Sequence, residues 1–136
     1  MTTSLGMEVR LEIPFEAALA RTREALKAEG FGVLTEIDMQ AAFKDKLGRV
    51  FRPYVILGAC NPPLAHRALS ADPEVGLLLP CNVTVEAEDT GEVVVRVLDP
   101  ERLMAAAALA GSAELALVAK DAGERLRRVA LALGEE

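Results

Sequence analysis

Residues 53–59 constrain the fold more than any other stretch of the chain, because their apolar residues are continuous. A strand with one solvated face alternates between apolar and polar residues, whereas a strand covered on both faces does not. The segment therefore predicts a buried strand near the centre of a sheet. After Cys60 come Asn61, a good helix N-cap, and Pro62, a good first helical residue, which predicts a helix shortly after this strand.

The other expected strands alternate with a period of two, which is typical of strands with one buried face. They cover residues 5–13, 31–39, 81–88 and 93–98. Asp89-Thr90-Gly91 separates the last two and indicates a short hairpin turn. The chain therefore has about five strands, of which at least the last two form an antiparallel pair.

Helical periodicity fills most of the intervals between the strands. The expected helices cover residues 14–30, 39–48, 62–72, 100–111 and 112–133. Their starts carry capping residues, namely Asp38, Asn61, Asp99 and Ser112. The apolar residues 76–80 show no pattern that predicts their form.

This order of elements predicts a single domain over residues 1–136 with an α+β fold. We expect a two-layer sandwich, in which a mixed, mainly antiparallel sheet of about five strands carries its helices mainly on one face. The second face of strand 53–59 then needs a cover. A partner subunit and the helix after Met39 are the two candidates.

Charge and hydropathy exclude several classes of protein. The net charge is −6, so the basic face of a general nucleic-acid-binding protein is not expected. No stretch approaches the roughly 18 apolar residues of a membrane span. The first residues lack the charged and apolar regions of a signal peptide, so we expect a cytoplasmic protein whose thiols are kept reduced.

Scarce polar residues gather around two short motifs, Cys-Asn-Pro and Pro-Cys-Asn. The whole chain contains two cysteines, one histidine and one tyrosine. Both cysteines are followed by asparagine, and the tyrosine and the histidine lie six residues to either side of the first cysteine. The candidate ligand-binding residues from this pattern are Cys60, Asn61, Cys81, Asn82, Tyr54 and His66.

A local basic segment precedes the buried strand. Lys44, Lys46 and Arg52 belong to it, opposed by Asp45 alone. A solvated helix end explains these charges simply. The alternative is that they attract an anionic or carboxylate ligand, and on that alternative they join the candidate ligand-binding residues.

The cysteines allow two chemical alternatives. Cys60 lies just ahead of a helix N-terminus, which favours a thiolate, and His66 would then act as its base in a thiol-dependent enzyme. Cys60 and Cys81 together would bind a transition metal only if both lie at the same end of the sheet. That requires an antiparallel return between residues 60 and 81, because a parallel crossover would separate them. Small core residues are the simpler interpretation of both.

Three stretches of the sequence resemble the bacterial and archaeal "domain of unknown function 302" family. They are residues 29–38, residues 57–63 with Leu-Gly-Ala-Cys-Asn-Pro-Pro, and residues 77–83 with Leu-Leu-Leu-Pro-Cys-Asn-Val. The resemblance covers nearly the whole chain. It implies a compact α+β domain, dimeric, without a settled biochemical activity.

The function that fits these observations is a non-enzymatic, dimeric small-ligand-binding or regulatory module, with a small anionic ligand as the candidate partner. Its site would lie where the Cys-Asn-Pro motif meets the Pro-Cys-Asn motif. The alternatives are the thiol-dependent enzyme, the transition-metal protein and an adaptor that only dimerises. The residues identify neither a ligand nor a cofactor, and whether the chain is an enzyme stays open.

Overall fold

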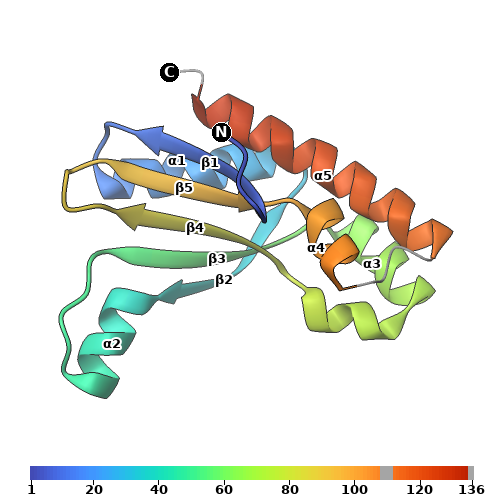
Figure 1. Ribbon diagram of the computed structural model, residues 1–136, viewed down its shortest axis with the longest axis horizontal. Helices are drawn as coiled ribbons and strands as arrows, with labels where there is room; N and C mark the ends of the chain where they lie inside the picture. The colour runs from blue at the N-terminus through green and yellow to red at the C-terminus, as the bar shows by residue number, and fades with distance from the viewer. Residues whose placement is uncertain (108–111, 135–136) are drawn as a thin grey trace.

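A computed structural model describes residues 1–107 and 112–134 of the chain (Figure 1). Within these residues, five strands form one sheet: β1 (Gly6–Leu11), β2 (Gly32–Asp38), β3 (Tyr54–Cys60), β4 (Cys81–Ala87) and β5 (Val93–Leu98). The α-helices are α1 (Phe15–Ala28), α2 (Met39–Leu47), α3 (Pro62–Ala71), α4 (Pro100–Ala106) and α5 (Ala113–Gly134). A short 3₁₀ helix, η1 (Pro73–Leu78), links α3 to β4.

The strand order in the sheet is β1-β5-β4-β3-β2, and every neighbouring pair is antiparallel. The predicted α+β architecture is confirmed. The central strand, however, is β4. β3 is an interior strand beside it, and its residues alternate between buried and half-buried along much of its length. The continuous apolar residues of β3 are therefore explained by its position in the interior of the sheet and by the partial cover of its second face.

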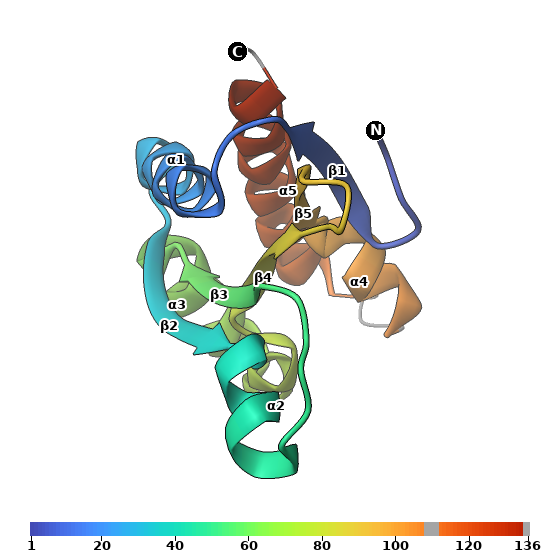
Figure 2. The ribbon, with the colours of Figure 1, turned by 90° about the vertical axis from the view of Figure 1, so that its left-hand side faces the viewer.

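The helices lie mainly on one face of the sheet, as expected (Figures 1 and 2). α5 packs against α1, α3 and α4 and also contacts β1 and β5. α2 is the exception, because it contacts β3 and stands apart at the end of β2 and β3, as Figure 2 shows. No helix in the described part of the chain is long and apolar enough to cross a membrane.

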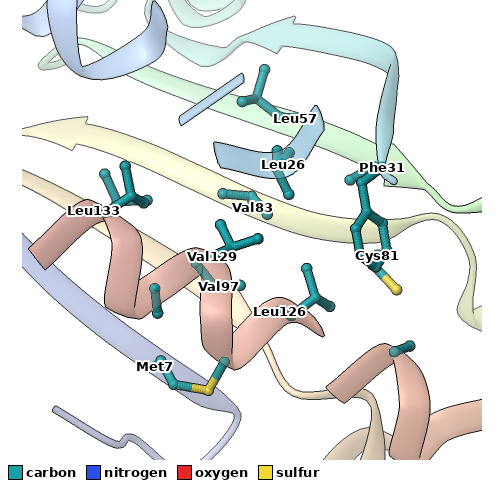
Figure 3. Close-up of a cluster of buried hydrophobic side chains, with 14 of the residues drawn as sticks. Met7, Leu26, Phe31, Leu57, Cys81, Val83, Val97, Leu126, Val129 and Leu133 are labelled. Carbon is teal, nitrogen blue, oxygen red and sulfur yellow. The ribbon is translucent and has the colours of Figure 1, made fainter. Parts of the chain in front are cut away.

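The core lies between the sheet and this helical layer (Figure 3). Alternate residues of each inner strand supply its sheet side, and the apolar stripe of α5 supplies much of the other. Fully buried members include Leu57, Val83, Val85, Val95, Leu126 and Val129. Burying each such side chain stabilises the fold by about 1.5–3 kcal/mol relative to exposing it, so the alternation determines which face turns inward.

We call the opposite side of the sheet the open face. Its middle carries the alternate, more polar residues of the strands, including Glu8, Tyr54, Asn82, Thr84, Glu86 and Arg96. Part of its cover comes from the segment around α2, because the Phe51 ring contacts Tyr54 at 6.3 Å between centroids and Phe43 at 5.1 Å. One of the two covers considered for β3 is thus present within the chain, at the β2–β3 end.

The predicted helix caps are present as hydrogen bonds. Asp38, Asn61, Asp99 and Ser112 accept backbone N–H groups through their side chains. The helix expected over residues 100–111 ends at Ala106, and residues 108–111 lie outside the described residues. The apolar residues of η1 did not predict its 3₁₀ form. The Asp72 side chain caps this helix by accepting the backbone N–H of Glu74.

Candidate functional site

The two cysteine motifs meet at one end of the sheet. β3 ends at Cys60 and β4 begins at Cys81, and Ala59 is the residue paired with Cys81 across the two strands. α3 and η1 return the chain so that β4 runs antiparallel to β3. Of the two topologies that the sequence left open, the structure therefore has the one that makes the cysteines neighbours.

Gly58 explains how closely the motifs approach each other. It pairs with Asn82, and a Cβ atom at this position would lie 2.8 Å from Cγ of Pro80. The hydroxyl of Thr35 would be closer still. Real Cβ atoms do not approach other atoms to 2.8 Å, so glycine is what lets the Leu79–Pro80 turn, whose peptide bond is cis, lie against β3.

Asn61 holds the start of α3 rather than facing a ligand. Its side-chain Oδ1 accepts the backbone N–H of Leu64 at 3.2 Å, and the residue is buried. Gly30, with a φ of 85°, lies against it, since a Cβ there would be 2.9 Å from Asn61 Nδ2. The glycine near the end of the first helix and the asparagine of the motif are thus a packed pair.

A small cavity lies on the helix side of this junction, and we call it the sulfur cavity. Its volume is about 50 Å³, and Cys60, Asn61, Cys81 and Met104 are on its wall with apolar residues from α3 and α5. Cys81 is 8% exposed, whereas Cys60 is half-buried. Phe31 lies beside Cys81 at the end of the labelled core side chains in Figure 3.

Burial dominates the chemistry of Cys81. It raises the pKa of the Cys81 thiol to about 11, and the neighbouring Cys60 contributes in the same direction. A thiol with this pKa is protonated at neutral pH, and the thiolate is the nucleophilic form. Cys81 is therefore no nucleophile in the free protein.

A much larger depression lies on the open face, and we call it the open groove. Its volume is about 770 Å³. One wall comes from residues 3–8 and the other from residues 77–80, with Leu98 and Leu103 adding apolar surface. Its floor carries four polar side chains, Tyr54, Asn82, Thr84 and Arg96. Thr84 Oγ1 is buried and has no hydrogen-bond partner among the described residues.

Ion pairs connect the charged residues of the groove floor. Arg96 donates to Glu8 at 3.1 Å and to Glu86 at 2.6 Å, and Arg52 donates to the other oxygen of Glu86. Burial alone would raise the pKa of Glu86, but the hydrogen bonds from Arg96 and Arg52 outweigh it and hold this pKa below its ordinary value. Glu86 is therefore a charged, buried anchor for two arginines.

The remaining predicted site residues lie away from the cysteines. Tyr54 and Cys60 are at opposite ends of β3, roughly 20 Å apart by the rise of an extended strand. Lys44 and Lys46 belong to the last turn of α2, at the Tyr54 end. Arg52 is at that end too, where it pairs with Glu86 and stacks 4.6 Å above the Phe51 ring. The basic segment and the Cys60 motif thus form no common site within one chain.

His66 does not join Cys60 at the sulfur cavity. α3 contributes Leu64, Ala65 and Ala68 to the wall, which is the stripe that the helix turns inward, and His66 is not part of it. Nothing in this arrangement supports a Cys60–His66 pair. Within residues 1–107 and 112–134, no group of three or more His, Cys, Asp and Glu side chains is placed to hold a metal ion.

Sequence reasoning missed Thr84, Arg96 and Met104 as site residues. A signal existed for Thr84 and Arg96, because the period of two in β4 and β5 places them on the same face as Asn82. The paired register of Thr84 and Arg96 brings them side by side. Met104 had no such signal, since its place depends on how α4 packs against α5.

Comparison with known proteins agrees with this architecture. The family described as "Domain of unknown function DUF302" matches residues 7–133. The chain belongs to this family. A crystal structure of an uncharacterized conserved DUF302 protein from Bacillus stearothermophilus is similar to this DUF302 domain, with 30% sequence identity and a TM-score of 0.83, covering 96% of this chain and 98% of that chain. No curated protein matches the chain.

Proposed function

We propose that this domain binds a small molecule in the open groove and acts as a cytoplasmic homodimer with a binding or regulatory role. Sites for small molecules usually enclose about 300–1,000 Å³ and are mostly apolar with a few polar groups. The open groove, with about 770 Å³, falls in that range. The sulfur cavity, with about 50 Å³, is too small for an organic ligand.

The hydroxyl of Thr84 is the observation that carries this proposal. Its oxygen is buried without a hydrogen-bond partner in the described residues, at the floor of the groove. Leaving such a group unpaired costs about 1–3 kcal/mol, and nearly all buried polar groups in proteins have partners. A change of the Thr84 rotamer that turns its covered hydroxyl toward the groove would let a polar atom of a ligand seated between Tyr54 and Asn82 supply the missing partner.

The groove favours a ligand with an apolar body and one acidic group. Leu77, Leu98 and Leu103 offer contact to the apolar part. Arg96 is the basic side chain on the floor, and its 3.1 Å bond to Glu8 is longer than its 2.6 Å bond to Glu86. A ligand carboxylate would compete with Glu8 for Arg96, while Glu86 keeps the guanidinium in position.

A second copy of the chain is the cover we propose for the open face. Apolar side chains are exposed at the rim of the groove, with Leu5 at 55% and Leu77 at 85% of their surface in solvent. Covering them would remove apolar area from water and enclose the ligand. Light scattering after size exclusion should give twice the 14.5 kDa chain mass. If the protein is a monomer at all working concentrations, the proposed dimer is refuted, while the proposed ligand site in the groove is unaffected.

Isothermal calorimetry with aliphatic and aromatic monocarboxylates tests the ligand site. We expect saturable binding that weakens about tenfold or more in Arg96→Gln and in Thr84→Val, since each variant loses a hydrogen bond to the ligand. Arg67→Gln is the matched control, because Arg67 pairs with Glu114 on the helix side and is absent from the groove wall. Binding that all three variants retain equally would refute the groove as the site.

A further inference from the structure

Residues 39–51, which we call the arm, project from the end of β2 and β3 (Figures 1 and 2). α2, the helical half of the arm, has no buried residue. Val50, in the half that returns to β3, is 97% exposed, which is the highest value among the large apolar side chains of the described residues. Apolar surface that gathers on a projecting element is typical of an interaction site.

The arm is hollowed between α2 and the returning chain, and we call this depression the arm hollow. Its volume is about 420 Å³, and its wall consists of Gln40, Ala41, Lys44, Arg49, Val50 and Phe51. The Gln40 side chain donates a hydrogen bond to the carbonyl oxygen of Phe51 at 3.0 Å, which holds the two halves of the arm together. The arm therefore presents apolar surface with two cationic side chains, Lys44 and Arg49, beside it.

The short helix η1 carries the complementary features. Glu74 and Leu77 are three residues apart, and a 3₁₀ helix has three residues per turn, so both lie on the same side of η1. Val75 is fully buried and fixes η1 to the core, whereas Glu74 and Leu77 are exposed. We call these two residues the ridge. It presents a large apolar side chain beside a carboxylate, which is the counterpart of an apolar hollow beside two cations.

The arm and the ridge project from the same side of the molecule at opposite ends of the sheet, as Figure 1 shows, with η1 as the yellow-green segment between α3 and β4. The arm returns to β3 at Tyr54, whereas the ridge precedes Cys81, which lies beside the other end of β3. These ends are roughly 20 Å apart by the rise of an extended strand, so an arm does not reach the ridge of its own chain. A two-fold axis between two copies lets each arm meet the other ridge, and both contacts then form at once.

We propose that the arm hollow of each copy receives Leu77 of a second copy of the chain, so that two identical contacts between arm and ridge hold the homodimer. In this dimer Leu77 packs against Val50, and Lys44 and Arg49 pair with Glu74 of the partner subunit. Lys44, Arg49 and Glu74 have no ion-pair partner among residues 1–107 and 112–134, so the new pairs break no existing one. The apolar contact supplies most of the affinity, and the charges at its rim determine which surfaces meet.

The inference rests on the homodimer of the proposed function and specifies its interface. Leu77 is also part of the wall of the open groove, so an arm docked on it lies beside the mouth of that groove. The partner subunit thereby brings its Lys44 and Arg49 toward the Pro-Cys-Asn motif. Within one chain these basic residues lie at the other end of the sheet, so the dimer joins two regions that a single chain keeps apart.

Light scattering after size exclusion, repeated over a dilution series, tests the interface through the dissociation constant of the dimer. We expect this constant to rise about tenfold or more in Val50→Glu and in Leu77→Lys, since each change puts a charge into the apolar contact. Leu117→Glu is the matched control, because Leu117 is an exposed leucine of α5 in the helical layer, and it should leave the constant unchanged. An equimolar mixture of Val50→Glu and Leu77→Lys should dimerise again. One of its two contacts is unaltered, and the other joins the introduced carboxylate to the introduced ammonium group.

Three results would overturn the inference. If Val50→Glu and Leu77→Lys both dimerise as tightly as the unaltered protein, the interface lies elsewhere, while the proposed dimer and the ligand site stand. If the mixture stays monomeric, the arm does not meet the ridge. If the unaltered protein is a monomer at all concentrations, the inference fails together with the proposed dimer, and the arm serves a different partner. All three substituted side chains are exposed, so the variants should fold, and circular dichroism of each one checks this before the dilution series.

Discussion

Gly58 of β3 lies directly against Pro80, so that a Cβ atom on residue 58 would come within 2.8 Å of the proline Cγ. The contact joins the Leu-Gly-Ala-Cys-Asn motif to the Leu-Pro-Cys-Asn motif. It determines how the return segment enters β4 and therefore where Cys81 and Asn82 lie.

Gly58→Ala should destabilise the protein by about 1–3 kcal/mol, because Pro80 and Thr35 must move to admit the methyl group. The free energy of unfolding from urea denaturation measures the effect. Gly32→Ala is the control, since nothing lies within 4 Å of a Cβ at residue 32. Equal losses for both variants would show that the close packing is not the cause.

Glu86→Gln should lower the free energy of unfolding at pH 7 by about 1–3 kcal/mol, because it removes the charge that Arg52 and Arg96 share. The pKa of Glu86 is lowered in the folded protein, so its stabilising contribution is present above the ordinary carboxyl pKa and is lost as the pH falls through the lowered value. The difference from the unaltered protein should therefore shrink in acid. Glu74→Gln on exposed η1 is the control, and a difference independent of pH would contradict the prediction.

Stability of the protein should fall as the pH rises between about 9 and 11. The unfolded chain loses the Cys81 proton near the ordinary value of 9.0, whereas burial and the neighbouring Cys60 raise the folded pKa to about 11. The stabilisation from the protonated Cys81 thiol is complete below the ordinary pKa and is lost as the pH approaches the pKa of the folded protein. The shift between the two pKa values corresponds to about 2–3 kcal/mol in the free energy of unfolding. Denaturant unfolding at stepped pH measures the slope. Cys81→Ala should have a shallower slope, and identical slopes would argue against the buried thiol as its source.

Thr84→Val should stabilise the ligand-free protein by about 1 kcal/mol. The two side chains have nearly the same shape, and the change removes a buried hydroxyl that has no partner in the described residues. Thermal unfolding reports the gain, with Thr90→Val in the exposed β4–β5 turn as the control. A clear loss of stability in Thr84→Val would mean that the hydroxyl is already satisfied.

The secondary structure followed from local signals. Asp38, Asn61, Asp99 and Ser112 each cap the helix that the sequence assigned to them, because capping needs only a side chain and an N–H group two or three residues away. The alternating residues of β4 likewise decided which of its faces is buried. Residues 73–78 gave no such signal, since a 3₁₀ turn of apolar residues has neither a strand nor an α-helix period.

The candidate site was predicted only in part. The sequence identified both cysteine motifs, but it also joined the basic residues Lys44 and Lys46 to them. The two lysines and the cysteine motifs lie at opposite ends of β3, because a strand is extended and its residues between Tyr54 and Cys60 run the whole length of β3. Residues that are close in the sequence were therefore wrongly expected to be close in space.

Local pattern was enough to determine the five strands, the helix starts and the choice of buried faces, because these depend on residues within one or two turns of each other. The tertiary structure alone decided that Cys60 and Cys81 are neighbours, that Thr84 and Arg96 share a groove with Asn82, and that Met104 lies on the wall of the small cavity beside Cys81. Such contacts depend on strand register and on the packing of α4 against α5. The free energy that selects them comes from burying the whole core at once, and no single stretch of sequence carries it.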